Sequence, residues 1–128
     1  MSDRLLLDTH ALLWWVTDDA RLAERHRARI RTATVFVSAA SAWEIHTKFR
    51  LGKLPAAAPF VADLEVEVAR NGFTELPISF ADGARAGAFA ADHKDLFDRI
   101  LAAQALNHRL ALVSNDTALD VFGIVRVW

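Results

Sequence analysis

Residues 5–16 of the chain read LLLDTHALLWWV. The three leucines form a short, wholly apolar run, which is typical of a strand that helices cover on both faces. An acidic residue, Asp8, follows directly, and residues 9–16 then have the composition of a helix. A buried strand that leads straight into a helix indicates an α/β fold.

The same alternation of strands and helices continues along the chain. Further strands are expected at residues 34–37, 73–76, 110–113 and 124–127, and further helices at residues 20–31, 41–50, 57–70, 80–91 and 97–107. Alternation of this kind implies right-handed crossover connections and a parallel sheet with helices on both faces. We therefore predict one domain over residues 1–128, a three-layer α/β sandwich with a mostly parallel central sheet of four to five strands.

Composition excludes several classes of protein. The chain has 128 residues, enough to bury a core, and its 53% hydrophobic content favours a folded globule over disorder. Its longest apolar run, residues 11–16, is far shorter than the roughly 18–20 residues of a membrane span. The N-terminus lacks a signal-peptide pattern, and the absence of cysteine excludes disulfides and thiolate zinc sites. These observations predict a cytoplasmic protein without membrane contact.

The charges are balanced overall but segregated along the chain. The formal net charge is −1, whereas a dedicated nucleic-acid binder usually has a basic surplus. Five arginines nevertheless lie within residues 21–31. A run of this kind is either a solvated helix face or a surface for phosphate groups, and the composition alone leaves both interpretations open.

Two acidic residues stand at or near the ends of predicted strands, where an open parallel sheet binds its ligands. Asp8 follows the first strand, and Asp116 lies just beyond the strand at residues 110–113. Either could simply cap the helix that comes next. The apolar flanks of Asp8 need a further explanation, because a carboxylate in such surroundings requires a compensating partner.

Two more acidic residues lie on predicted helices. Glu44 completes a possible capping box at residues 41–44 (SAWE), and it forms a favourable i, i+4 pair with Lys48. Asp98 lies near a helix start, where the helix dipole favours an acid. Asp98 nevertheless shares a stripe with apolar residues, and Asp95 is the better capping residue.

The four acids together make a stronger case than any one of them. Carboxylates that converge at one edge repel each other and raise each other's pKa unless a cation neutralises them. Hard oxygen ligands without sulfur select Mg²⁺ or Mn²⁺. We therefore predict a divalent-metal site formed by Asp8, Glu44, Asp98 and Asp116.

The chain resembles the PIN-domain family, specifically the VapC-type toxin ribonucleases of bacterial toxin–antitoxin pairs. The resemblance is carried, in family order and spacing, by the segments LLLDTHALLW (5–14), VSAASAWEI (37–45), DLFDR (95–99), AAQA (102–105) and LVSND (112–116). It implies that the four acids surround the metal and that Thr9 and Ser114 support them. One departure is Leu96, which stands where close relatives often have proline.

The resemblance also implies an activity and partners. The implied protein is a metal-dependent endoribonuclease in which one or two ions activate a water and hold a phosphate oxygen. It acts as a homodimer with a cognate antitoxin. Arg25, Arg29 and Lys48 are candidate contacts to the RNA backbone. Large apolar residues left exposed near Trp43 would form a groove for a partner helix, which in the resembling toxins is the antitoxin.

Two other functions remain possible from the residues alone. A phosphotransfer or phosphatase module could use Asp8 as its nucleophile, but receiver domains also need a paired acid near the first strand and a lysine after the last. Asp3 is too early for the first, and no lysine lies beyond Lys94. A non-catalytic PIN-like module could bind RNA or protein only, although four intact acids argue against it.

Overall fold

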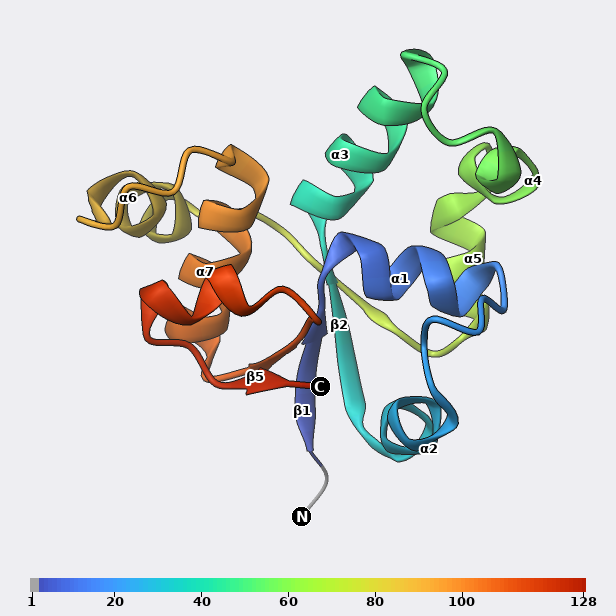
Figure 1. The fold of residues 1–128 in the computed structure, drawn as a ribbon, viewed down its shortest axis with the longest axis horizontal. Helices are drawn as coiled ribbons and strands as arrows, with labels where there is room; N and C mark the ends of the chain where they lie inside the picture. The colour runs from blue at the N-terminus through green and yellow to red at the C-terminus, as the bar shows by residue number, and fades with distance from the viewer. Residues whose placement is uncertain (1–2) are drawn as a thin grey trace.

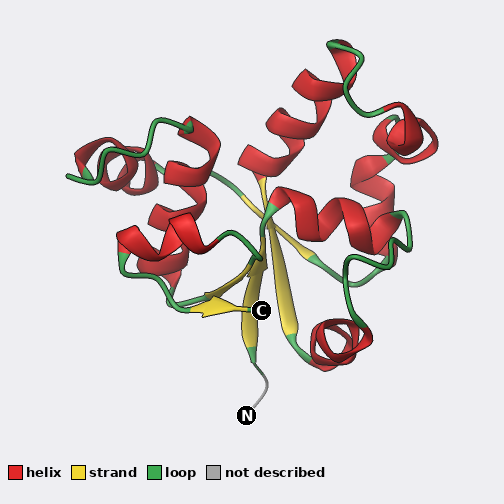
Figure 2. Ribbon diagram, in the orientation of Figure 1, coloured by secondary structure: helices red, strands yellow, loops and turns green. Residues whose placement is uncertain are grey.

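A five-stranded sheet forms the centre of the computed structural model, which describes residues 3–128 (Figures 1 and 2). The strand order is β3-β2-β1-β4-β5, and all four pairings are parallel. The strands are β1 Arg4–Leu7, β2 Thr34–Ser38, β3 Thr74–Leu76, β4 Ala111–Val113 and β5 Arg126–Val127. The predicted α/β fold with a parallel central sheet is confirmed.

The central position of β1 follows from its three leucines. Neighbouring residues of a strand point to opposite faces of the sheet. Leu5 and Leu7 therefore enter the core on one face, and Leu6 enters the core on the other. All three are at most 1% exposed. A strand buried on both faces needs apolar residues at every position, which is what residues 5–7 supply.

Helices cover both faces of the sheet, as Figure 1 shows. The core that contains Leu5 and Leu7 is completed by α1, α2, α3, α4 and α5, whereas α7 and a 3₁₀ helix, η2, complete the core around Leu6. The helix α6 packs on α7. The helices are α1 Thr9–Val16, α2 Glu24–Thr32, α3 Ala39–Arg50, η1 Pro55–Ala57, α4 Ala58–Val61, α5 Leu64–Arg70, α6 Phe80–Ala88, α7 Leu96–His108 and η2 Thr117–Phe122. No helix among residues 3–128 is long and apolar enough to cross a membrane.

The third helix begins earlier than predicted, which corrects one interpretation of Glu44. Its capping residue is Ser38, whose Oγ accepts a hydrogen bond from the Ala40 amide at 2.9 Å. Ser41 lies inside the helix, and its hydroxyl accepts a hydrogen bond from Thr9 instead of capping. The predicted capping box at residues 41–44 is therefore wrong, and Glu44 has no capping function.

Other helix boundaries differ for identifiable reasons. The helix expected at residues 57–70 is divided into η1, α4 and α5. Pro59 lies in the first turn of α4, where a missing amide hydrogen is tolerated. The helix expected at 80–91 ends at Ala88, because the carbonyl groups that follow it bind the Arg99 side chain. The helix expected at 20–31 begins only at Glu24.

Candidate active site

Two neighbouring strand ends place the first pair of acids. The strands β1 and β4 pair in register at Leu7 and Val113. Asp8 follows β1, and its amide donates a hydrogen bond to the Val113 carbonyl at 3.1 Å. Asp116 lies three residues after β4. Both acids therefore lie at the carboxyl edge of the sheet, the position expected for ligand-binding residues.

Both of these acids also cap helices. Asp8 Oδ1 accepts a hydrogen bond from the Ala11 amide at 2.7 Å, at the start of α1. Asp116 Oδ1 accepts one from the Ala118 amide at 3.0 Å, at the start of η2. Asp95, not Asp98, caps α7, as the sequence suggested. Capping holds the carboxylates in place and uses only one oxygen of each.

The four predicted acids line one pocket of about 150 Å³. Asp8 and Glu44 are buried, with 6% and 5% of their surface exposed. Asp98 is partly buried and Asp116 is exposed at the rim. The remaining lining residues are Thr9, His10, Lys48, Asp95 and Leu119. The fold thus gathers carboxylates from four separate segments of the chain.

Burial raises the pKa of two of these carboxyl groups. The pKa of Asp8 is raised chiefly by burial and further by the negative charge of Glu44, although contacts with Ser114 and the Ala11 amide oppose the rise. The pKa of Asp98 is also raised chiefly by burial, against the effect of its bond to His93. Perturbed carboxyl groups in a pocket are typical of functional sites.

The side chains fit a divalent cation by their chemistry. All the charged groups that could act as ligands in the pocket are carboxylates, which suit Mg²⁺ or Mn²⁺. Within residues 3–128, however, no three His, Asp or Glu side chains are arranged close enough to share an ion. Two acids already have partners: Lys48 Nζ lies 2.5 Å from Glu44 Oε2, and His93 Nε2 lies 2.8 Å from Asp98 Oδ2.

The two predicted supporting residues, Thr9 and Ser114, form hydrogen bonds that connect the segments around the pocket. Thr9 Oγ1 donates a hydrogen bond to Ser41 Oγ at 3.1 Å, and both residues are buried. This bond ties the first turn of α1 to α3, the helix that carries Glu44. Ser114 Oγ accepts a hydrogen bond from the Asp116 amide at 3.1 Å, which orients the backbone of that acid.

Comparison with known proteins identifies the family. The family described as "PIN domain" matches residues 5–124. The chain belongs to the PIN-domain family. Members of this family are generally nucleases that use divalent metal ions, in agreement with the carboxylate pocket. No curated protein matches the chain.

Two solved structures share the fold of this PIN domain. The first is described as VapBC2 from Rickettsia felis bound to a DNA fragment from their promoter, with a TM-score of 0.66, 12% identity and 96% of each chain covered. The second is described as FitAB bound to an IR36 DNA fragment, with a TM-score of 0.60 and 18% identity. That match covers 96% of this chain and 93% of the other. At these identities the likeness is one of fold.

The residues predicted to contact RNA do not lie together in this PIN domain. Lys48 lines the carboxylate pocket, but its ammonium group is bound to Glu44. Arg25 and Arg29 lie on α2, near the lower ends of β1 and β2 in Figure 1, where these strands begin. Arg29 pairs there with Asp3 at 2.6 Å. The structure therefore does not bring these two arginines to the pocket.

His93 is a site residue that the sequence did not reveal. It lies in the loop between α6 and α7 and contacts Asp98 through Nε2. The loop is held by the Arg99 guanidinium group, which donates hydrogen bonds of 2.7–3.0 Å to the carbonyl groups of Ala86, Phe89, Ala91 and His93. No periodic pattern marks a loop histidine, so only the folded chain shows this contact.

We expect Arg99→Lys to destabilise the domain by about 1–3 kcal/mol, since it leaves some of these partly buried carbonyl groups unpaired, and an unpaired buried group costs about 1–3 kcal/mol. A lysine has three donors on one nitrogen and cannot reproduce the planar fork of arginine. Urea unfolding measures the loss. The matched control is Arg85→Lys, which affects an exposed arginine that bonds Asn107. Equal urea midpoints for Arg99→Lys and the wild type would show that the guanidinium does not order this loop.

Large apolar residues remain exposed on α3 and directly after it. Trp43, Phe49 and Leu51 are 55%, 38% and 54% exposed, whereas Trp14 is buried in the core. A groove of about 560 Å³ runs between α1 and residues 53–60. His10 lines both this groove and the carboxylate pocket. Trp43, Phe49 and Leu51 do not line this groove, whose large apolar lining residues are Leu13, Trp14, Leu54 and Phe60.

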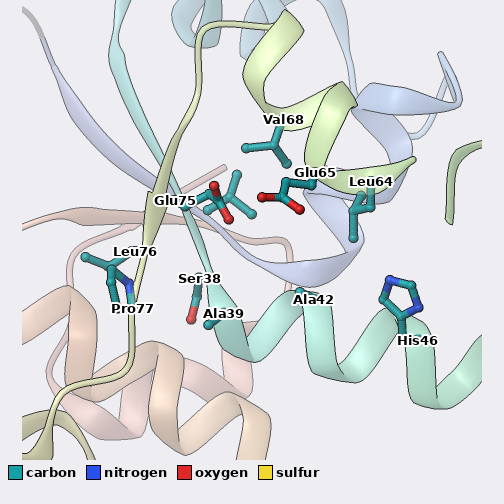
Figure 3. Close-up of a pocket in the computed structure, with 11 residues that line it drawn as sticks. Ser38, Ala39, Ala42, His46, Leu64, Glu65, Val68, Glu75, Leu76 and Pro77 are labelled. Atoms are coloured by element: carbon teal, nitrogen blue, oxygen red, sulfur yellow. The ribbon is translucent and has the colours of Figure 1, made fainter. Parts of the chain in front are cut away.

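A separate pocket of about 360 Å³ lies between α3, α5 and β3 (Figure 3). The side chains of Glu65 and Glu75 point toward each other across it, and His46 lies at its far side. None of the four predicted acids lines this pocket. It is therefore a different pocket from the one that the four acids line at the carboxyl edge of the sheet.

Proposed function

We propose that this PIN domain, residues 1–128, is an endoribonuclease that depends on Mg²⁺ or Mn²⁺ and hydrolyses RNA phosphodiester bonds. The observation that carries the proposal is the gathering of Asp8, Glu44, Asp98 and Asp116 around one pocket. These four carboxylates would hold the ion, and because no three of them are close enough to share one as they stand, binding would draw their side chains together. When bound, a divalent ion lowers the pKa of a coordinated water and stabilises negative charge on a phosphate oxygen.

The chain itself supplies rigid placement of the acids. Asp8 is fixed by the Val113 carbonyl on one side and the Ala11 amide on the other. Asp116 is fixed through Ser114. Groups held on strand ends and helix starts keep their positions better than groups on free loops, and this precision favours catalysis. Thr9 contributes by fixing α1 against α3.

We further propose that the domain is the toxin of a cytoplasmic toxin–antitoxin pair and acts as a homodimer. Its motifs resemble those of VapC-type toxins, and its fold is similar to chains in the structures described as VapBC2 and FitAB. The groove between α1 and residues 53–60 suits an apolar segment of an antitoxin. Arg25 and Arg29 remain proposed contacts to the RNA backbone at a distance from the acids.

A cleavage assay on 5′-labelled single-stranded and hairpin RNAs tests the proposed activity. We expect cleavage with Mg²⁺ or Mn²⁺ and none with excess chelator, because without a cation the clustered carboxylates repel the RNA phosphate. Restoring Mn²⁺ after chelation controls for damage to the protein. Cleavage that persists in chelator would contradict the metal requirement. RNA binding without cleavage under every metal condition would instead support the non-catalytic alternative.

A further inference from the structure

Lys48 and Glu44 form a charged pair inside the carboxylate pocket. They lie one turn apart on α3, with Nζ and Oε2 at 2.5 Å. The Glu44 side chain is only 6% exposed, and the Lys48 side chain is 33% exposed. A buried carboxylate is stable only with a partner of opposite charge or with hydrogen bonds. In this structure the partner of Glu44 is the ammonium group of Lys48.

Lys48 has a special position in the charge balance of the pocket. Five carboxylate residues line the pocket: Asp8, Glu44, Asp95, Asp98 and Asp116. Among the described residues that line it, Lys48 is the only lysine or arginine. Its ammonium group is therefore the lysine or arginine charge of the pocket, and it lies against Glu44 Oε2. Because it is attached to the chain, this positive charge is present whether or not metal is bound.

Two-metal nuclease sites hold their ions roughly 3.5–4 Å apart between shared carboxylates. A second ion held by Glu44 would compete with Lys48 for Oε2. The positive charge of the ammonium group would also strongly repel a divalent ion that lay within roughly 4 Å of it.

We propose that Lys48 takes the place of a second metal ion, so that the pocket binds one divalent cation among its remaining acids. The proposal rests on the proposed function, because it assumes that the pocket binds Mg²⁺ or Mn²⁺. The proposal also gives Lys48 a different role from an RNA contact. The Lys48 ammonium group neutralises Glu44 and thereby sets the number of metal ions in the site.

Calorimetric titration of the whole chain with Mn²⁺ tests this proposal without reference to activity. We expect one Mn²⁺ per wild-type chain and two per Lys48→Gln chain, because glutamine removes the ammonium charge and leaves Glu44 free. Lys48→Arg keeps the positive charge and is expected to bind one ion. Arg50→Gln is the matched control, since Arg50 is an exposed cation on the last turn of the same helix. It is also expected to bind one.

The double variant Lys48→Gln/Glu44→Gln is expected to return to one ion, which would locate the second ion at Glu44. Two ions in the wild type, or one in Lys48→Gln, would overturn the role of Lys48 and leave the proposed nuclease intact. No Mn²⁺ binding by any variant would overturn the proposed metal site itself. If Lys48→Gln unfolds without metal, Mn²⁺ should refold it by replacing the ammonium charge, and failure to refold in millimolar Mn²⁺ would overturn the inference.

Discussion

Asp98→Asn is expected to reduce RNA cleavage roughly 10²- to 10³-fold while leaving the fold intact. A bound metal ion supplies several kcal/mol of transition-state stabilisation, and each 1.4 kcal/mol corresponds to about a tenfold change in rate. Asparagine keeps the shape of the side chain but removes the charge that would hold the ion. Asp98 does not cap α7, because Asp95 has that function, so the helix should remain.

The rate is measured with labelled RNA at saturating Mn²⁺, and the fold is checked by circular dichroism. The matched control is Asp63→Asn, which changes an exposed acid between α4 and α5, outside the pocket. The control should cleave at the wild-type rate. Wild-type cleavage by Asp98→Asn would remove Asp98 from the site, and an unfolded variant would show that this residue is structural.

Asp8→Asn is expected to stabilise the metal-free protein at neutral pH and to abolish its stabilisation by Mn²⁺. Burial raises the pKa of Asp8 above its ordinary value of 3.8 in the folded protein. The folded state therefore binds more protons than the unfolded state between these two pKa values. As a result, the free energy of unfolding falls as the pH rises through this interval. Above the interval the ionised Asp8 carboxylate still destabilises the folded state, and this cost no longer changes with pH.

Asparagine removes this cost and can still accept the hydrogen bond from the Ala11 amide. We expect a rise of several degrees in Tm, since about 1 kcal/mol shifts the Tm of a domain of this size by roughly 3–6 °C. Thermal unfolding at pH 4 and pH 7, with and without Mn²⁺, measures both effects. Mn²⁺ should raise the wild-type Tm, because a ligand of the folded state stabilises it.

The same pair of pH values separates the alternatives for Asp8. If the Tm of Asp8→Asn exceeds the wild-type Tm by little at pH 4 and by much more at pH 7, Asp8 behaves as a buried carboxylate. If the variant is less stable than the wild type at both pH values, Asp8 serves mainly as a helix cap. An unchanged response to Mn²⁺ would exclude Asp8 from the metal site.

The parallel sheet could be predicted because its signals are local. Three consecutive apolar residues at 5–7 require cover on both faces, and this requirement alone places the strand in the interior of a layered fold. Helix boundaries were predicted less well. The start of α3 depends on whether Ser38 or Ser41 caps it, and both lie in a sequence that suits a cap. In the structure Ser38 caps the helix, and Ser41 instead accepts a hydrogen bond from Thr9, a residue distant in sequence.

The grouping of the acids could be anticipated for a similar reason. Parallel strands end at the same edge of the sheet, so residues that follow them, such as Asp8 and Asp116, are brought together by topology. Surface positions are not determined in this way. Arg25 and Arg29 belong to a basic run, but α2 precedes its strand and lies at the opposite edge of the sheet from the acids.

The sequence by itself determined the layered parallel fold and the four acidic residues, because apolar periodicity and strand order are properties of the chain. The i, i+4 spacing also indicated Lys48 as the partner of Glu44. Only the tertiary structure decided that this pair lies in the pocket and that His93, from a loop whose carbonyl groups bind Arg99, contacts Asp98. Such contacts depend on side-chain directions and distances across the fold, for which a linear pattern carries no signal.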